Sequence, residues 1–472
     1  IKESSYRIAA ALKNNNYNLP GKKITINMAP ADLRKEGSAY DLTLAIGILA
    51  ASGQIKPEEV GKYIIMGEMS LDGGLQPIRG ALSIAIKAKE EGFAGIILPI
   101  QNVKEAAIVE GLEVYGVENV LQVINFFEGK ETLIPTVIDT KEEFSKNLEF
   151  PEFDFADVKG QESIKRCMEI AAAGGHNIIL IGPPGAGKTM LAKRLPSILP
   201  PMSMHEALET TKIHSVTGRI KDAGLLTQRP FRAPHHTASS VSLVGGGSYP
   251  QPGEISLAHN GVLFLDELPE FKREVLEVMR QPLEDREVTI ARAKFTITYP
   301  SSFMLVASMN PSPSGFFMDS KNSNGASQME MQRYLSKISG PLLDRIDIHI
   351  EVTPVPFEKL SETRKAESSV EIRKRVTKAR DIQTKRFENY NHIHYNAQMS
   401  SKLIREYCDL DEVSLQLLKT AMERLNLSAR AYNRILKVSR TISDLENSEN
   451  VHSHHIAEAI QYRSLDREGW LG

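Results

Sequence analysis

The chain has 472 residues, of which 41% are hydrophobic and 25% are charged, a composition that is typical of globular proteins and excludes a largely disordered chain. Its 57 Lys and Arg residues against 59 Asp and Glu residues give a net charge of −2, so no overall basic field indicates binding to nucleic acid or to an anionic membrane. Its two cysteines, Cys167 and Cys408, exclude a disulfide framework, and without a membrane-length apolar run or a secretory leader we expect a cytoplasmic protein.

The first part of the chain predicts a small α+β domain. Residues 1–130 alternate helical and extended patterns, and apolar runs at 63–66 and 96–98 are bounded by glycine and proline. The periodicity then fades among charged and turn-forming residues, which predicts an exposed linker at 131–155.

Residues 156–355 predict an α/β core. Apolar runs without polar alternation at 177–181, 261–265 and 303–306 indicate strands that are buried on both faces. The helical patterns between them favour a three-layer arrangement. Residues 356–472 are almost wholly helical in pattern and predict a separate helical domain.

A phosphate-binding loop follows the first of these strands. The motif G-x-x-x-x-G-K-[ST] is matched by Gly182, Pro183, Pro184, Gly185, Ala186, Gly187, Lys188 and Thr189. The order strand, glycine-rich turn, helix is the context in which backbone N–H groups cradle phosphates. We expect Lys188 to contact the β- and γ-phosphates of ATP and the Thr189 hydroxyl to bind Mg²⁺.

Polar side chains end the next two strands. Asp266 and Glu267 follow the run at 261–265, and Asn310 follows the run at 303–306. Carboxyl ends of neighbouring parallel strands meet at one edge of a sheet. We therefore expect Asp266 to hold Mg²⁺, Glu267 to polarise the attacking water and Asn310 to orient that water. Asn310 precedes Pro311, so a simple turn residue remains an alternative.

Two longer segments resemble a known family. Residues 252–268 read PGEISLAHNGVLFLDEL and resemble the signature of the magnesium-chelatase-like AAA+ ATPases. Residues 342–347 read LLDRID and make the chain similar to the ComM/YifB family. The resemblance covers nearly the whole chain. It implies a homo-oligomeric ring, a hexamer, that uses ATP and Mg²⁺ to move branched or single-stranded DNA during natural transformation.

The resemblance also implies roles for two arginines. Arg345 would be the arginine finger of a neighbouring subunit's site, where a guanidinium spreads the charge of the transferring phosphoryl group. An intrachain ion pair with Asp344 or Asp347 is the alternative. Arg430 matches the second sensor arginine of the helical lid, with Arg434 one helical turn further on as its competitor.

The first domain resembles the peptidase domain of Lon. Ala39 stands where that family has its nucleophilic serine, and Leu82 stands where it has its lysine. Neither side chain can attack a carbonyl or activate a nucleophile. We therefore expect no peptidase activity.

A zinc site of the family is also missing from this sequence. Many members carry two C-x-C pairs, and the matching positions here are Ser312, Ser314, Asn324 and Ala326. We expect no zinc. We do not expect histidines to supply a metal site in place of these cysteines. We expect five of them to be polar surface residues: His235, His236, His452, His454 and His455.

Two basic residues of a predicted hairpin are candidates for nucleic-acid contact, since the resemblance implies that this hairpin points into the pore of a ring. Residues 286–299 predict a hairpin with Arg292 and Lys294 near its tip, and repetition around a ring would form a collar that tracks phosphates. A solvated hairpin is an equally good interpretation. The glycine-rich insert at 231–249 predicts a mobile loop, and the basic helix around 373–380 predicts a solvated face.

Two rival functions remain open. A magnesium-chelatase-type subunit would use the same core, although a Lon-like first domain argues against it. A protein-remodelling ATPase would line its pore with aromatic side chains, and Phe231 and Tyr249 are available for that.

Overall fold

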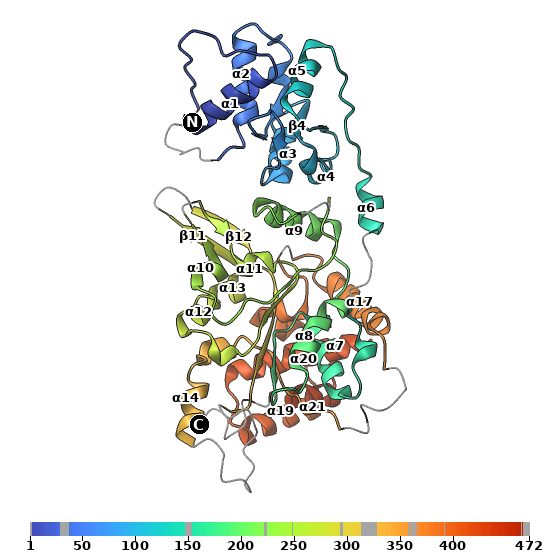
Figure 1. Cartoon of the computed structure of the whole chain (residues 1–472). Helices are drawn as coiled ribbons and strands as arrows, with labels where there is room; N and C mark the ends of the chain where they lie inside the picture. Colours follow the sequence, from blue (N-terminus) through green and yellow to red (C-terminus); the bar gives the residue numbers. More distant parts are fainter. Residues whose placement is uncertain are drawn as a thin grey trace. The chain divides into compact units, whose positions relative to one another are not determined.

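The computed structural model divides the chain into two compact units (Figure 1). Unit 1 comprises Ile1–Leu148 and Ser203–Gln228, and unit 2 comprises Glu149–Met202 and Arg229–Gly472. The residues that the structure describes are 2–28, 37–146, 153–220, 224–247, 249–292, 296–312, 328–356, 359, 366–390, 392–463 and 465.

Unit 1 is built on a parallel sheet in the order β1-β4-β5. Its strands are β1 (Tyr63–Ile65), β2 (Glu68–Met69), β3 (Leu75–Gln76), β4 (Gly95–Pro99) and β5 (Glu113–Val117). Its helices are α1 (Lys2–Asn14), α2 (Asp41–Ala51), α3 (Ala81–Glu90), α4 (Val103–Ala106), α5 (Val120–Glu128), α6 (Thr140–Lys146) and α9 (Met204–Val216). The two predicted apolar runs form β1 and β4.

Successive residues of β4 point to opposite faces of this sheet. Ile97 packs with residues of α1, α2 and α5, whereas Ile96 and Leu98 pack with residues of α3 and α4. Figure 1 shows β4 between these two groups of helices. The predicted α+β character of this part of the chain thus takes the form of a small sheet covered on both faces.

A segment from the middle of the chain belongs to unit 1. Ser203 and Glu206 form a capping box at the start of α9, and α9 packs on α3. The Gly80 N–H also donates to the Ser215 carbonyl at 3.0 Å. Residues 203–228 therefore interrupt the range 156–355 that the sequence analysis predicts as one core.

The predicted linker contains a helix. The Glu142 N–H donates to Asp139 Oδ1 at 3.0 Å, so the Asp139 carboxylate caps the first turn of α6. Charged residues suggest an exposed connector, but Lys and Glu also favour helices. Part of the predicted linker is therefore helical.

Unit 2 is built on a five-stranded parallel sheet in the order β14-β6-β13-β10-β7. Its strands are β6 (Ile178–Ile181), β7 (Phe231–Arg232), β8 (Gly245–Gly246), β9 (Gln251–Pro252), β10 (Val262–Leu265), β11 (Glu287–Ala291), β12 (Thr296–Pro300), β13 (Met304–Met309) and β14 (Ile348–Glu351). The three predicted strands are β6, β10 and β13, and each is buried along its whole length.

Helices cover both faces of this sheet. The helices of the core are α7 (Glu162–Gly174), α8 (Lys188–Arg194), α10 (Ser240–Val244), α11 (Glu254–Leu257), α12 (Arg273–Glu277), α13 (Arg280–Asp285), α14 (Gln328–Leu335) and α15 (Gly340–Leu343). Ile178 and Leu180 pack toward α7 and α8, whereas Ile179 and Ile181 pack toward α10, α11 and α12 (Figure 1). The predicted three-layer α/β fold is confirmed.

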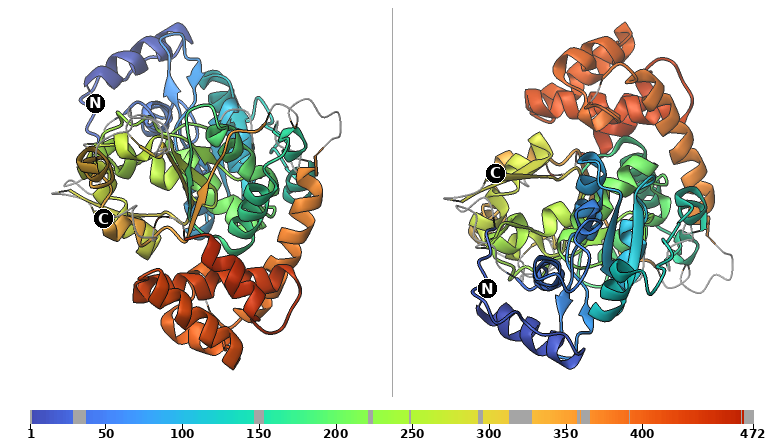
Figure 2. Two further views of the ribbon diagram at one scale, coloured as in Figure 1. Left: turned by 90° about the horizontal axis from the view of Figure 1, so that it is seen from below. Right: turned by 90° about the horizontal axis from the view of Figure 1, so that it is seen from above.

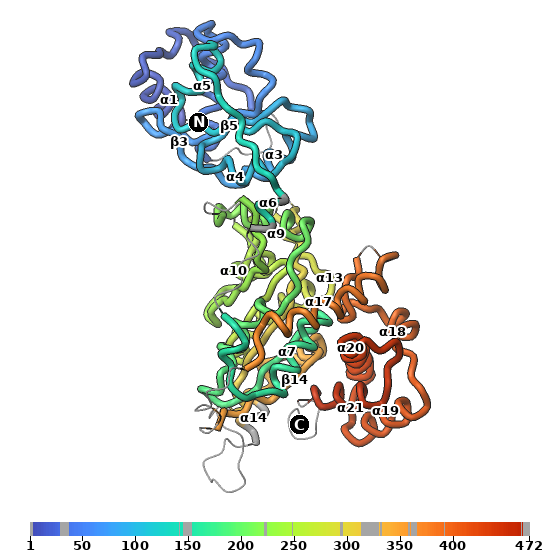
Figure 3. The backbone as a smooth tube through the Cα atoms, turned by 90° about the vertical axis from the view of Figure 1, so that its right-hand side faces the viewer, coloured from blue at the N-terminus to red at the C-terminus, as the bar shows by residue number. Residues whose placement is uncertain are grey.

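The end of the chain is helical, as predicted. Its helices are α17 (Ser369–Arg386), α18 (Ser401–Tyr407), α19 (Glu412–Arg424), α20 (Ala429–Leu445) and α21 (Ser453–Gln461). Helices α18 to α21 form a group of their own, seen in red in Figure 2 and labelled in Figure 3. Helices α17 and α20 pack on α7 and join this lid to the core.

Buried polar contacts also tie the lid to the core. His176 follows α7, and its ring lies 2.9 Å from Asp347 Oδ2 and 2.8 Å from Thr441 Oγ1 of α20. Burial opposes ionisation of Asp347, but the Arg434 guanidinium and the His176 hydrogen bond outweigh it and hold the pKa of that carboxyl well below its usual range.

None of the helices in the described part of the chain has the length and apolar composition needed to cross a membrane.

Candidate active site

The predicted phosphate loop connects β6 to α8. Gly187 precedes α8 with a φ of 89°, in the left-handed region that favours glycine. A Cβ on Gly182 would lie 2.3 Å from the Val352 carbonyl oxygen, so no larger residue fits there. Both glycines keep the loop backbone in the tight turn that presents N–H groups to an anion.

Lys188 is directed back into this loop. Its Nζ donates to the carbonyls of Gly182 at 2.6 Å and Pro183 at 3.0 Å, and to Asn310 Oδ1 at 3.0 Å. Burial lowers the pKa of the Lys188 ammonium, although the charges of Asp266 and Glu267 partly restore it. A phosphate anion beside Nζ would favour the charged form further.

Asp266 ends β10 beside the start of α8. The Thr189 hydroxyl donates to Asp266 Oδ2 at 2.8 Å, and Ser308 of β13 donates to Oδ1 of the same carboxylate. The two predicted Mg²⁺ ligands are therefore within hydrogen-bond distance of each other. Oxygen ligands of this kind suit Mg²⁺ in a nucleotide site.

Glu267 follows with an unusual backbone conformation. Its φ is 53°, and its N–H donates to Ser308 Oγ at 3.2 Å. A non-glycine residue in the left-handed region is strained and is often found at functional sites. The Glu267 side chain is 54% exposed, and its Oε2 lies 3.8 Å from Nδ1 of His236.

Asn310 lies at the same edge of the sheet. Because β13 is between β6 and β10, the end of β13 brings Asn310 to both the phosphate loop and the carboxylates. Its side-chain oxygen accepts from Lys188, and its carbonyl accepts from the Tyr334 hydroxyl at 3.3 Å. Asn310 is thus part of this constellation as well as the residue before Pro311.

Two residues of this site are absent from the predicted set. Ser308 holds both Asp266 and the Glu267 backbone, and the sequence does carry a signal for it. It is a polar residue in an apolar strand, two positions before Asn310 and therefore on the same face. His236 is predicted as a surface polar residue, and no motif in the sequence relates it to Glu267.

Arg345 lies at the opposite edge of the sheet from the phosphate loop. Its carbonyl accepts from Asn177 Nδ2 at 2.9 Å, and Asn177 precedes β6, whereas the loop follows β6. Four strand residues separate these edges, a span of about 13 Å at about 3.3 Å per residue. The structure therefore does not bring Arg345 to the phosphate loop of its own chain.

The intrachain partner of Arg345 is neither Asp344 nor Asp347. Its guanidinium donates to the carboxylate of Glu284 and to the Pro341 carbonyl. The pairing was not predictable because Glu284 lies 61 positions away, in α13. The side chain is 14% exposed, and its buried Nε has no hydrogen-bond partner among the described residues.

The two candidate sensor arginines differ in their surroundings. Arg434 pairs with the buried Asp347 at 2.8 Å and is 25% exposed. Arg430 pairs with Asp344 and is 71% exposed. Asp344 directly precedes Arg345 in the chain, so its ion pair brings Arg430 close to the segment that contains Arg345. Arg434 has a buried structural partner, and Arg430 has more freedom to reach a ligand.

The predicted hairpin is present and packs on the glycine-rich insert. Strands β11 and β12 are antiparallel, with Ile290 opposite Ile297. Arg292 Nε donates to the Gly247 carbonyl at 3.4 Å, and the Tyr299 hydroxyl donates to the Pro250 carbonyl at 2.9 Å. Lys294 lies outside the described residues. The insert is not simply an irregular loop, since Ser239 caps the short helix α10 within it.

Most arginines of the basic helix α17 are bound within the chain. Arg373 donates to the Ser197 carbonyl, Arg375 to Glu169 and Glu367, and Arg380 to the Ala172 carbonyl. These arginines therefore have structural partners, whereas the sequence predicts a solvated face.

The histidines near the last helix form a hydrogen-bonded cluster. Glu446 Oε2 lies 3.1 Å from both His454 Nε2 and His455 Nε2, a grouping of metal-ligand type. His455 is fully buried, so its prediction as a surface residue is wrong. Burial is tolerated because its ring nitrogens have polar partners: Nδ1 accepts the His452 N–H at 2.9 Å and so caps α21. That bond requires the neutral ring to carry its proton on Nε2, the nitrogen that faces Glu446.

Of the four positions that replace the family's cysteine pairs, Ser312 is buried. Ser314, Asn324 and Ala326 lie outside the described residues.

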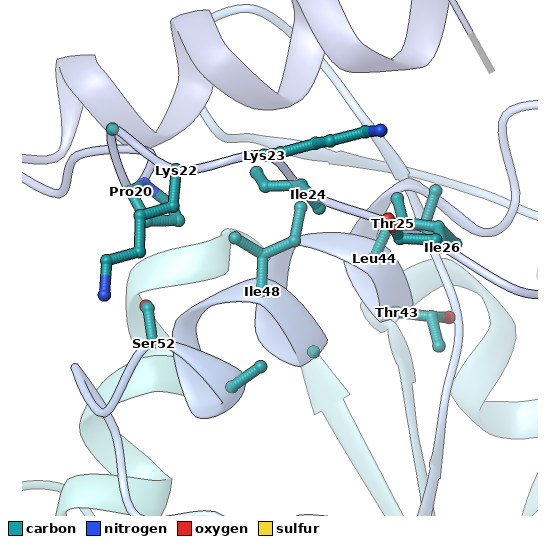
Figure 4. A pocket seen from close by; sticks show the side chains of 13 residues that line it. Pro20, Lys22, Lys23, Ile24, Thr25, Ile26, Thr43, Leu44, Ile48 and Ser52 are labelled. Atoms are coloured by element: carbon teal, nitrogen blue, oxygen red, sulfur yellow. The ribbon is translucent and has the colours of Figure 1, made fainter.

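In unit 1, Leu82 is fully buried, and Ala39 packs partly buried against a neighbouring apolar cluster. The same unit holds a cavity of about 630 Å³ between α2 and residues 20–26 (Figure 4). It is lined by Ile24, Leu44 and Ile48 together with the stems of Lys22 and Lys23. No residue of the phosphate loop lines this cavity.

Three family models describe most of the chain. Magnesium chelatase, subunit ChlI, matches residues 154–360. Subunit ChlI of Mg-chelatase matches residues 1–102, and magnesium chelatase, subunit ChlI C-terminal, matches residues 366–463.

Two full-length relatives have the same level of identity. The competence protein ComM of Haemophilus influenzae is 44% identical over 469 residues, which is 99% of this chain and 90% of that protein. The uncharacterized protein YifB of Escherichia coli has the same identity and coverage. Lon protease 2 of Bacillus subtilis is 28% identical over 152 residues, 30% of this chain and 27% of that protease.

Proposed function

The chain belongs to the ComM/YifB family of magnesium-chelatase-like AAA+ ATPases, and we propose that it works as a ring-shaped motor that hydrolyses ATP to move DNA. ATP hydrolysis is supported by one observation: four side chains lie together at one edge of the sheet, namely Lys188, Asp266, Glu267 and Asn310. Their geometry fits Mg²⁺-ATP, because a phosphate-binding lysine, oxygen ligands and a carboxylate that can act as a base converge beside a glycine loop.

In this proposal each residue has one role. Loop N–H groups and Lys188 bind the phosphates, and Thr189 with Asp266 would hold the Mg²⁺, which supplies charge neutralisation at the β- and γ-phosphates. Glu267 accepts a proton from the attacking water. Ser308 supports both carboxylates by fixing Asp266 and the Glu267 backbone.

The position of two arginines supports a ring. Arg345 and Arg430 lie together at the sheet edge that faces away from their own phosphate loop. In a closed head-to-tail ring, that edge of one subunit can meet the loop of the next. We propose a homo-hexamer in which both arginines serve the neighbour's ATP.

The DNA half of the proposal depends on the hairpin and on one relative. Val288 and Ile290 anchor β11 in the core, so the exposed Arg292 extends from a firmly held base. A relative with 44% identity is named a competence protein, which agrees with handling DNA during natural transformation. Protein remodelling is less favoured, since Phe231, one of the two aromatic candidates for lining a pore, stacks on Phe264 with ring centroids 6.0 Å apart.

The decisive measurement is the ATPase rate with and without DNA. We expect single-stranded or branched DNA to stimulate turnover and the ring to migrate a branched junction when ATP is hydrolysed. An ATPase that neither binds nor responds to single-stranded, duplex or branched DNA would place protein remodelling first.

Replacing Arg292 and Lys294 by alanine should weaken binding to all DNA sequences alike. Phosphates carry no base information, and each lost contact should reduce the slope of log affinity against log salt by about 0.7–0.9. Basal ATPase should remain, because Arg292 contacts Gly247 rather than the phosphate loop. Salt titrations of DNA binding, with DNA-stimulated ATPase beside them, measure both effects.

The matched control removes two exposed cations elsewhere, Lys374 and Lys378 of α17. If both double variants lower the salt slope equally, general charge explains the binding. If neither changes it, the hairpin does not contact DNA.

A further inference from the structure

The loop after β7 brings a histidine to the proposed catalytic glutamate. Strand β7 pairs in parallel with β10, so the segment after β7 lies beside the end of β10, where Glu267 begins. Within this loop His236 Nδ1 lies 3.8 Å from Glu267 Oε2. That separation exceeds a hydrogen bond, so a hydrogen bond through Nδ1 requires the Glu267 side chain to turn toward the ring.

The His236 ring is held in place by its neighbours. It forms a T-shaped pair with the Phe271 ring, with ring centroids 6.4 Å apart, and a tilted contact with the His235 ring, with centroids 4.1 Å apart. The side chain is 33% exposed. His235 has a different polar partner, because its Nδ1 lies 2.9 Å from the Thr237 hydroxyl. Of the two histidines, His236 is therefore the one that faces the carboxylate.

Glu267 has a fixed backbone and a free side chain. The Ser308 hydrogen bond holds its N–H, but three side-chain torsions remain and more than half of the side chain is exposed. A general base is effective only while its carboxylate is directed at the attacking water. Something beyond the backbone has to limit those torsions.

We propose that His236 is a positioning residue that restrains the Glu267 carboxylate, through Nδ1, in the direction from which it activates water. This inference rests on the proposed role of Glu267. It adds a residue of the β7–α10 loop to the site, whereas the phosphate contacts of Gly182–Thr189 remain independent of it.

The test compares His236→Ala with His235→Ala in the full-length assembled protein. We expect His236→Ala to lower kcat for ATP hydrolysis about ten- to a hundredfold, the range for a misplaced reacting group. The KM for ATP should change less than twofold. His236→Asn retains a polar nitrogen close to the position of Nδ1 and should recover part of kcat, and His235→Ala should stay near the parent.

Combining substitutions separates this inference from the proposed function. In a Glu267→Gln background, His236→Ala should cause no further loss, because the group that it positions is already inactive. If Glu267→Gln is inactive but His236→Ala keeps kcat within twofold of the parent, the positioning role is wrong and the proposed function stands. If His235→Ala and His236→Ala lower kcat and raise KM alike, the loop is structural. Full activity of Glu267→Gln would overturn both.

Discussion

Glu267→Gln should bind ATP with nearly parental affinity and hydrolyse it at least about a hundredfold more slowly, the lower bound for loss of a general base. The amide has the size and shape of the carboxylate but cannot accept the proton of the attacking water. The Glu267 side chain takes part neither in the hydrogen bond of Lys188 to the loop nor in the Thr189–Asp266 hydrogen bond. Nucleotide binding and steady-state turnover, measured on the same preparation, separate these effects.

Glu270→Gln is the matched control. Glu270 lies three positions further along, on the surface, where it pairs with Lys337 at 3.3 Å. The same chemical change there should leave turnover within about twofold of the parent, as expected for an exposed ion pair. Comparable ATPase rates in Glu267→Gln and the parent would remove Glu267 from the mechanism.

Lys188→Ala should fail at the binding step instead. It removes the ammonium that we propose to contact the phosphates, so the affinity for ATP should fall together with turnover. Lys193→Ala changes an exposed lysine of the same helix and should bind ATP normally. Unimpaired ATP binding by Lys188→Ala would contradict the assignment of the loop.

The core of the site is predictable from sequence because its signals are local. The phosphate loop, Asp266, Glu267 and Asn310 each follow an apolar run, and parallel strands bring such positions to one edge. The strand order itself is not local. It places Asn310 between the loop and the carboxylates, which no spacing along the chain shows.

Contacts between segments distant in the chain cannot be predicted from local sequence patterns. His236 reaches Glu267 only because β7 pairs with β10. Arg345 pairs with Glu284 across 61 positions, whereas the sequence offers only the adjacent aspartates as candidates. Residues 203–228 join unit 1 through contacts with α3, which no local pattern in the sequence indicates.

The expected result for Arg345→Ala is a loss of turnover of about a thousandfold or more, in the range reported for arginine fingers, with ATP binding retained. The reason lies in the position of this residue. Its backbone is held by Asn177 at the edge of the sheet away from its own phosphate loop. In the proposed ring the guanidinium therefore stabilises the transferring phosphoryl group of a neighbouring subunit.

Mixing variants tests the direction of this contact. Lys188→Ala subunits bind ATP poorly but carry an intact Arg345, and Arg345→Ala subunits have the opposite defect. In a random equal mixture about a quarter of the head-to-tail contacts combine an intact loop with an intact finger. Activity should therefore reappear on mixing, and it should depend on the ratio of the two variants.

Glu284→Gln distinguishes a finger from a structural ion pair. If Arg345 acts only by pairing with Glu284, then Glu284→Gln should reproduce the loss seen with Arg345→Ala, and no mixture should recover activity. If Arg345 acts on the neighbour's nucleotide, Glu284→Gln should keep most of the turnover, because it leaves the guanidinium in place and removes the carboxylate that competes for it. Recovery on mixing, together with an active Glu284→Gln protein, would assign the catalytic arginine to the adjacent subunit.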